Sequence, residues 1–184
     1  MSQDLPVTSY ALLGLLTFGD DLTGYELKQR ADRTLRFYWV SPAMSQVYTE
    51  LGRLADLGLV KAREAGRDNR SSRYRITAKG RRTLTRWLEE SPVDFPVLKH
   101  PVALRLLIGH LVDPPRLVKM LEEHLDALAA RRAELVGVRE SLRGADATGQ
   151  PFHYPAMVAE WGLDYFDGER AVLERLRERL EDGG

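Results

Sequence analysis

The 184-residue chain is 43% hydrophobic and 29% charged, which is ordinary for a globular protein with one core or two modest ones. It contains no cysteine, so disulfides, thiolate metal sites and cysteine nucleophiles are excluded. No run approaches the roughly 18 apolar residues of a membrane span, and the N-terminus lacks the pattern of a signal peptide. We therefore expect a cytoplasmic protein that does not enter membranes.

The overall charge balance conceals an asymmetry. The chain holds 27 basic and 27 acidic residues, but residues 1–90 contain 15 basic against 11 acidic residues, and the remainder 12 against 16. Between residues 61 and 86 there are two acidic residues and ten basic ones: Lys61, Arg63, Arg67, Arg70, Arg73, Arg75, Lys79, Arg81, Arg82 and Arg86. Such a stripe matches a phosphate backbone, although a charged run alone is equally typical of a solvated surface.

Three helices are expected before residue 58. Two span about residues 7–18 and 23–34, and a third begins at Ser41 and Pro42, an N-cap oxygen followed by an N1 proline. Apolar residues recur along the third helix at steps of three and four: Met44, Val47, Leu51 and Leu54. Its remaining surface carries polar residues: Ser45, Gln46, Thr49 and Arg53. Gly58 can end this helix.

A charged β-hairpin is expected directly after the third helix. Val60 and Ala62, then Tyr74 and Ile76, alternate with basic residues at a period of two, as in a half-exposed antiparallel hairpin. A fourth helix is expected over residues 78–90. Together the third helix and the hairpin indicate the recognition helix and wing of a DNA-binding domain.

Three segments of this region resemble the winged-helix domain of the PadR family of bacterial transcriptional regulators: LLGLLTFGDDLTGYELKQR, FYWVSPAMSQVYTELGRLADLGLV and SRYRITAKGRRTL. The resemblance covers roughly residues 7–90 and implies a transcriptional regulator, among which repressors are commoner. Two positions depart from the family pattern: Ser45, which is usually glycine, and Thr49, which is often proline. Both lie on the expected DNA-facing side, so they bear on the operator sequence and not on the fold.

Long helices are expected in the second half of the chain. A short apolar helix over residues 101–112 is followed by a long one from Pro114 to about Arg143, a flexible link over 144–150, and a last helix from Pro155 to about Leu180. On the last helix one side is expected to be apolar: Trp161, Tyr165, Val172, Leu176 and Leu180, widened by Met157, Leu163 and Phe166. This surplus of apolar surface indicates a second subunit, with an intramolecular three-helix bundle as the alternative.

We therefore predict a mainly α protein with a small β-hairpin wing. A winged helix-turn-helix domain over residues 1–90 is followed by a linker over 91–99 and an all-α domain over 100–184 for dimerisation and possible effector binding. The resemblance implies that the C-terminal helices of two copies pair into a homodimer. Such a dimer would place two recognition helices about 34 Å apart on a palindromic operator in double-stranded DNA.

Eight residues are expected to contact DNA: Ser45, Gln46, Tyr48, Thr49, Arg53, Arg67, Arg70 and Arg73. Gln46 can pair with adenine and Arg53 with guanine or phosphate, while the three hairpin arginines would bind the backbone or enter the minor groove. The resemblance favours a phosphate contact for Tyr48, but its spacing from Met44 equally allows packing.

A small aromatic effector is expected to bind where the two domains meet. Six residues could form its pocket: Phe37, Trp39, His110, His153, Trp161 and Tyr165. A flat phenolic molecule would suit such a pocket, as in some PadR-like repressors. Ordinary core or surface roles are the alternative for each of them.

Enzymatic signatures are absent from the sequence. Four histidines, His100, His110, His124 and His153, occur without HxxxH or HExxH spacing, and there is no glycine-rich phosphate loop or GxSxG motif. We expect no catalytic activity, no metal site and no cofactor. The alternatives are a small helical enzyme, or a winged helix that contacts proteins, which the arginine-rich hairpin disfavours.

Overall fold

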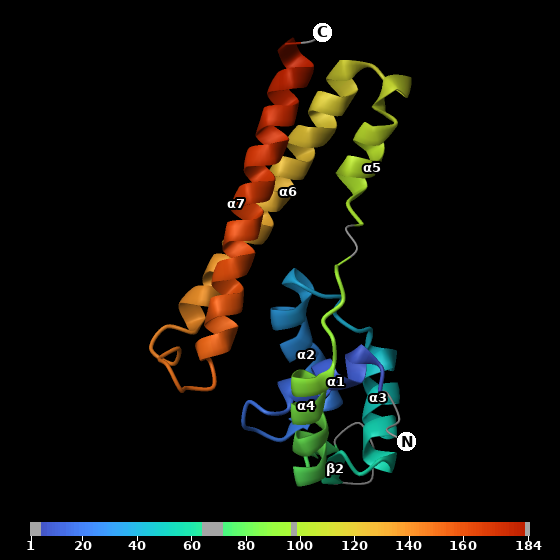
Figure 1. The fold of residues 1–184 in the computed structure, drawn as a ribbon, viewed down its shortest axis with the longest axis vertical. Helices are drawn as coiled ribbons and strands as arrows, with labels where there is room; N and C mark the ends of the chain where they lie inside the picture. The colour runs from blue at the N-terminus through green and yellow to red at the C-terminus, as the bar shows by residue number, and fades with distance from the viewer. Residues whose placement is uncertain (1–4, 64–71, 97–98, 183–184) are drawn as a thin grey trace. The chain divides into compact units, whose positions relative to one another are not determined.

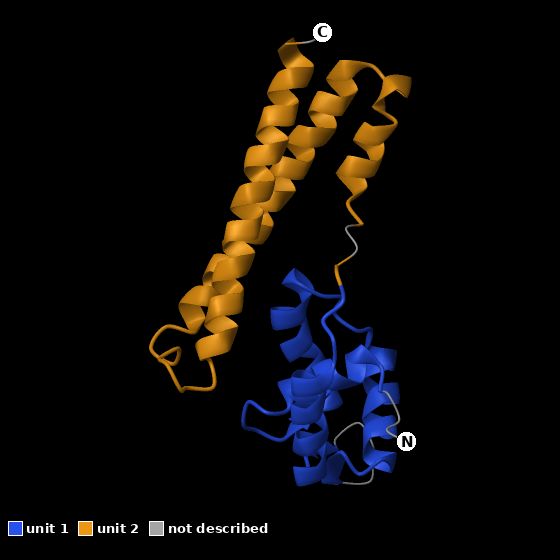
Figure 2. Ribbon diagram, viewed as in Figure 1, with its two compact units in different colours: residues 1–94 blue, residues 95–184 orange. Residues whose placement is uncertain are grey.

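The computed structural model describes residues 5–63, 72–96 and 99–182, and these form two compact units. The first comprises Met1–Asp94 and the second Phe95–Gly184 (Figure 2). The division falls inside the segment 91–99 that the sequence predicts to be a linker.

The N-terminal unit combines helices with a three-stranded antiparallel sheet (Figure 1). Its elements are α1 (Val7–Leu15), β1 (Leu22–Thr23), α2 (Gly24–Thr34), η1 (Leu35–Phe37), α3 (Met44–Asp56), β2 (Val60–Arg63), β3 (Arg73–Ile76) and α4 (Ala78–Glu90). The strand order is β1-β3-β2, with Lys61 opposite Arg75 in the hairpin. The predicted mainly helical fold with a hairpin wing is confirmed. The sequence did not predict β1, because two residues are too few for an alternating pattern.

Leucines from three helices fill the core of this unit. Leu12, Leu27 and Leu51, from α1, α2 and α3, are completely buried. Tyr10 on α1 stacks against Trp87 on α4, with ring centroids 4.6 Å apart, so α4 is held on the same core. These contacts make α3 an integral part of the unit.

The start of α3 differs from the sequence prediction. The helix begins at Met44 with Ala43 as its N-cap, and Ser41 does not cap it. The Ser41 hydroxyl instead donates to the Asp32 carboxylate on α2, at 2.6 Å. A strong carboxylate acceptor on a neighbouring helix therefore takes the hydroxyl that the local sequence assigned to the helix end.

Two glycines shape the passage from α3 to the hairpin and α4. Gly58 has a positive φ of 68°, which ends α3 as predicted. Gly80 lies so close to Leu59, the residue before β2, that a Cβ there would be 2.1 Å from the Leu59 carbonyl oxygen. Only a residue without a side chain therefore allows α4 to start so close to the hairpin.

The C-terminal unit is entirely helical in its described part. It contains α5 (Pro101–Leu107), the 3-10 turn η3 (Gly109–Leu111), α6 (Pro114–Ser141) and α7 (His153–Asp182), and α6 and α7 form an antiparallel hairpin (Figure 1). The helix predicted over residues 101–112 thus ends early and passes into η3. Among the described residues, no helix is both long enough and apolar enough to span a membrane.

The apolar side predicted on α7 is divided between a buried and an exposed part. Phe166 is buried, and Leu176 and Leu180 pack against the apolar core of this unit, whereas Trp161, Tyr165 and Val172 are exposed. The buried residues of α7 that the sequence did not single out are Ala156, Ala159, Gly162 and Leu173, and the small ones among them allow a close approach of α6. The apolar surface of α7 is thus wider than α6 covers.

We predict that Gly80→Ala destabilises the protein by about 1–3 kcal/mol, because the new methyl group overlaps a backbone carbonyl. Gly52→Ala is the matched control, since a Cβ at this exposed α3 position meets nothing within 4 Å and removes a glycine from a helix. Urea unfolding measures both. Equal stability of the two variants would contradict the close approach at Gly80.

Candidate nucleic-acid interface

One side of α3 is polar and exposed over its whole length. Val47, Leu51 and Leu54 are buried in the core, and the opposite surface is uncovered. Its exposed residues include four of the predicted DNA contacts: Ser45, Gln46, Thr49 and Arg53. The structure therefore brings these four together on one surface, as their spacing predicts.

Short-range bonds orient three of these side chains. The Thr49 hydroxyl donates to the Ser45 carbonyl at 2.9 Å, and the Gln46 side-chain oxygen accepts from the backbone N–H of Ala43 at 2.9 Å. The Arg53 guanidinium lies 3.7 Å from the Glu50 carboxylate. Gln46 thus closes the first turn of α3 through its oxygen and keeps its amide nitrogen available.

Tyr48 lies at the edge of this surface and packs on α2. It is half-buried, and a Cβ on Gly24 would be 2.5 Å from its ring. Glycine at the start of α2 therefore creates the space for the Tyr48 ring. This position agrees with both predicted roles of Tyr48. The ring packs on α2, and this packing does not exclude a contact between the phenol oxygen and a DNA phosphate.

Glu50 is the buried counterpart of the exposed polar residues on α3. Its carboxylate accepts a hydrogen bond from the Ser9 hydroxyl of α1, and both side chains are buried. This hydrogen bond joins the buried side of α3 to α1. The rotation of α3 about its axis is thereby set by a directional contact as well as by apolar packing.

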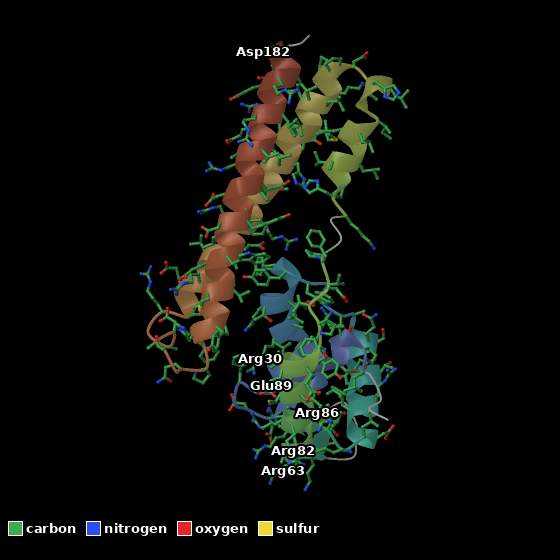
Figure 3. All side chains as sticks on the ribbon, viewed as in Figure 1. Arg30, Arg63, Arg82, Arg86, Glu89 and Asp182 are labelled. Carbon is green, nitrogen blue, oxygen red and sulfur yellow. The ribbon has the colours of Figure 1, made fainter. Side chains whose placement is uncertain are left out.

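Exposed basic side chains follow the hairpin and α4. Figure 3 shows Arg63, Arg82 and Arg86 along α4 and the end of β2. Lys61 and Arg81 are also exposed. Two predicted wing contacts, Arg67 and Arg70, lie outside the described residues.

Arg73 and Arg75, on β3, are tied to the β1–α2 region. Arg73 donates to the Asp21 carbonyl at 2.6 Å and lies 3.2 Å from the Glu26 carboxylate, and Arg75 pairs with the Asp21 carboxylate. Arg73 is therefore engaged within the fold, and its predicted contact with DNA would require exchange of these partners.

Glu26 serves two contacts at once. It forms a capping box with Thr23, accepting from the Thr23 N–H at 2.8 Å, and it pairs with Arg73. The Thr23 backbone hydrogen bond and the Arg73 charge lower the pKa of the Glu26 carboxyl below its ordinary value. The Thr23-x-x-Glu26 spacing is enough to predict the cap from the sequence. No local pattern indicates the pairing of Glu26 with Arg73, which is 47 residues away.

The six predicted effector residues are divided between the two units, and those of the C-terminal unit do not all lie together. Phe37 and Trp39 belong to the N-terminal unit. In the C-terminal unit, His110 in η3 and His153 at the start of α7 lie at opposite ends of the α6–α7 hairpin (Figure 1). Trp161 and Tyr165 do lie together, with stacked rings 6.1 Å apart. The effector site stays a prediction, and Trp161 and Tyr165 are two of its residues that lie in contact.

A separate depression of about 480 Å³ lies between α6 and α7. It is lined by Leu128, Ala129, Arg132, Ala133, Phe166, Asp167 and Arg170. Arg132 and Asp167 form a two-point ion pair inside it, with nitrogen–oxygen distances of 2.9 and 2.8 Å. The pair raises the pKa of the Arg132 guanidinium and lowers that of the Asp167 carboxyl, so both stay charged.

Two family models match the chain, one within each of the two compact units. Residues 12–86 match the transcriptional regulator PadR-like family, and residues 98–181 match the virulence activator alpha C-terminal family. The N-terminal unit is therefore a PadR-like domain. Among curated protein sequences, none matches this PadR-like chain.

Solved structures of PadR-like regulators have the same fold. Bacillus subtilis PadR in complex with operator DNA is 24% identical, with a TM-score of 0.81 over 95% of this chain and 99% of that one. The PadR-like regulator BC1756 from Bacillus cereus is 21% identical, with a TM-score of 0.78 over 96% and 99%. The Vibrio cholerae virulence activator AphA is 18% identical, with a TM-score of 0.73 over the same shares. The fold therefore extends over both units of this PadR-like chain.

We predict that Glu26→Gln destabilises the PadR-like chain by at most about 1 kcal/mol near neutral pH, because glutamine keeps the capping box and loses only a partly exposed ion pair. A carboxyl whose folded pKa is lowered stabilises the fold above its unfolded pKa. That stabilisation is lost as pH falls through the folded value.

The stability difference between wild type and Glu26→Gln should therefore shrink as pH falls below the ordinary value of 4.5. Urea unfolding at several pH values measures it, and a difference that grows on acidification would contradict the assignment.

Proposed function

We propose that this PadR-like protein is a homodimeric repressor that binds a palindromic operator and leaves it when a small aromatic molecule binds. The observation that carries the proposal is the exposed polar side of α3 beside the basic hairpin. α3 is held rigidly by its buried side, and a helix so held can enter a major groove as one piece. Acting on chromosomal DNA, the protein would work in the cytoplasm.

Residue roles in this proposal divide between base edges and phosphates. Ser45, Gln46, Thr49 and Arg53 would meet base edges or nearby phosphates from α3. Arg67, Arg70 and Arg73 would bind the DNA backbone, together with Arg63, which is exposed at the end of β2. The hairpin should then contribute affinity for any duplex, and α3 the choice of sequence.

Dimerisation is supported by apolar surface in the C-terminal unit. On α5, η3 and the segment after them, five large apolar residues are exposed: Leu104, Leu107, Ile108, Leu111 and Val112. Leu107 is 78% exposed, and on α7 Met157 and Val158 add further apolar surface. Such grouped exposure is typical of a surface that a second copy covers.

Two observations support the proposal that an effector releases the protein from DNA, one on a similar protein and one on this chain. Bacillus subtilis PadR, to which this chain is similar, has a solved structure in complex with p-coumaric acid. In this chain the stacked Trp161 and Tyr165 rings offer a flat, exposed surface on which an aromatic acid could stack. p-Coumaric acid is accordingly the first molecule to test.

A gel shift of the protein on its own upstream DNA tests the function. We expect binding that resists an unrelated duplex and that p-coumaric acid weakens. Arg67→Ala with Arg70→Ala should weaken binding to every sequence and reduce the slope of log affinity against log salt by about two.

Arg175→Ala with Arg179→Ala, which removes two exposed arginines of α7, is the matched control and should leave the slope unchanged. Absence of DNA binding at low salt would reject the regulator in favour of a winged helix that contacts proteins. A wing variant with the wild-type slope would reject the hairpin contacts alone.

We predict that Leu107→Asp with Leu111→Asp converts the dimer to a monomer, because two charges in an apolar interface lose their hydration. Leu88→Asp, at an exposed apolar position of α4, is the control and should stay dimeric. Sedimentation velocity distinguishes these states. A double variant that remains dimeric would place the interface elsewhere.

A further inference from the structure

Three side chains from three helices converge in the C-terminal unit. His100 precedes α5, His124 lies on α6 and Glu169 lies on α7, and one ligand atom from each is within 4.8 Å of the other two. The His100 Nε2 atom is 2.6 Å from the Glu169 carboxylate, and the rings of His100 and His124 meet edge to face with centroids 5.5 Å apart. The three residues are 24 and 45 positions apart in sequence, which explains why no local spacing reveals them.

The site is partly shielded from water. The side chains of His100 and Glu169 are only 15% and 18% exposed, and His124 is also half-buried. An apolar cluster of Val102, Leu121 and Leu173 lies on the same three helices. Each of its members is within four sequence positions of one of the three donor residues. The donors are therefore held by packed helices and not by mobile surface chains.

The donor set suits a divalent transition-metal ion. Two imidazole nitrogens and one carboxylate oxygen are ligands that Zn²⁺ accepts, with bonds of about 2.0–2.2 Å and a fourth position for water. Tetrahedral bonds of this length set the donor atoms about 3.3 Å apart. Donor atoms that already lie within 4.8 Å need only small side-chain rotations to reach this spacing.

We propose that His100, His124 and Glu169 form a binding site for one Zn²⁺ or similar divalent transition-metal ion per chain. The ion would join α5, α6 and α7 at a single point. Because α5 is the first helix after residues 91–99, the ion would fix where the chain enters the C-terminal unit. The proposal does not depend on DNA binding, and the metal has no catalytic role in it.

His100 must give up two hydrogen bonds when the ion binds. Its Nδ1 atom accepts from the backbone N–H of Ala103 at 3.2 Å, which leaves the ring proton on Nε2, facing Glu169. Coordination through Nε2 moves this proton to Nδ1. The ion therefore replaces the Nε2–Glu169 hydrogen bond and releases the Ala103 cap.

Zn²⁺ binding to the whole 184-residue chain, without an affinity tag, tests the site. A chromophoric chelator that competes for Zn²⁺ gives the stoichiometry and Kd, and Co²⁺ as a substitute reports the coordination through its visible absorption. We expect one ion per chain. Zn²⁺ at about 100 times its Kd should raise the Tm by about 5–10 °C.

The four histidines provide matched variants. His124→Gln and Glu169→Gln each remove one ligand, and His100→Asn removes the imidazole while keeping a side-chain acceptor for the helix start. His110→Gln and His153→Gln remove histidines outside the group. Circular dichroism checks that every variant retains its helices.

Loss of a ligand should weaken Zn²⁺ binding by about 100-fold or more, since even residues that only orient metal ligands contribute 10–100-fold. The His110 and His153 variants should bind as the wild type does. The site is overturned if the wild type binds no ion, if ligand variants bind as tightly as the wild type, or if His110→Gln and His153→Gln weaken binding equally. DNA binding of the ligand variants is a separate readout.

Discussion

Burial of one side of α3 is the constraint on which the candidate interface depends. Val47, Leu51 and Leu54 are completely buried, and each such side chain contributes about 1.5–3 kcal/mol through removal from water. Their spacing allows only one rotation of the helix in the core. The four polar residues Ser45, Gln46, Thr49 and Arg53 are consequently exposed, because any other rotation of α3 would bury them and expose three apolar residues.

A second set of contacts connects the hairpin to the helices that precede it. β1 pairs with β3, and Arg73 and Arg75 reach Asp21 and Glu26 across this junction. Glu26 also caps α2, so the same carboxylate orders a helix start and holds a strand. Gly80 at the start of α4 lies against Ile76 of β3 and the carbonyl of Leu59, which precedes β2, so the hairpin also has a close contact with α4.

Local patterns predicted most of the fold and part of the site. The periodicity of α3 and the alternation in β2 and β3 depend on neighbouring residues, and both predictions were confirmed. Ser41 failed as a cap because Asp32, on another helix, binds its hydroxyl. Which apolar side chains of α7 face α6 could not be predicted, because this depends on how closely the two helices approach. His100, His124 and Glu169 could not be grouped from the sequence, since only the packing of α5, α6 and α7 brings them together.

Gln46 has a consequence for how such a protein would distinguish one DNA sequence from another. To pair with adenine through both its amide groups, the side chain must release the Ala43 N–H that it now accepts. The start of α3 would then lose a cap worth about 1 kcal/mol. Discrimination at that base pair would thus be smaller than the hydrogen bonds alone suggest, since part of their free energy offsets the loss of the Gln46 contact with the Ala43 N–H.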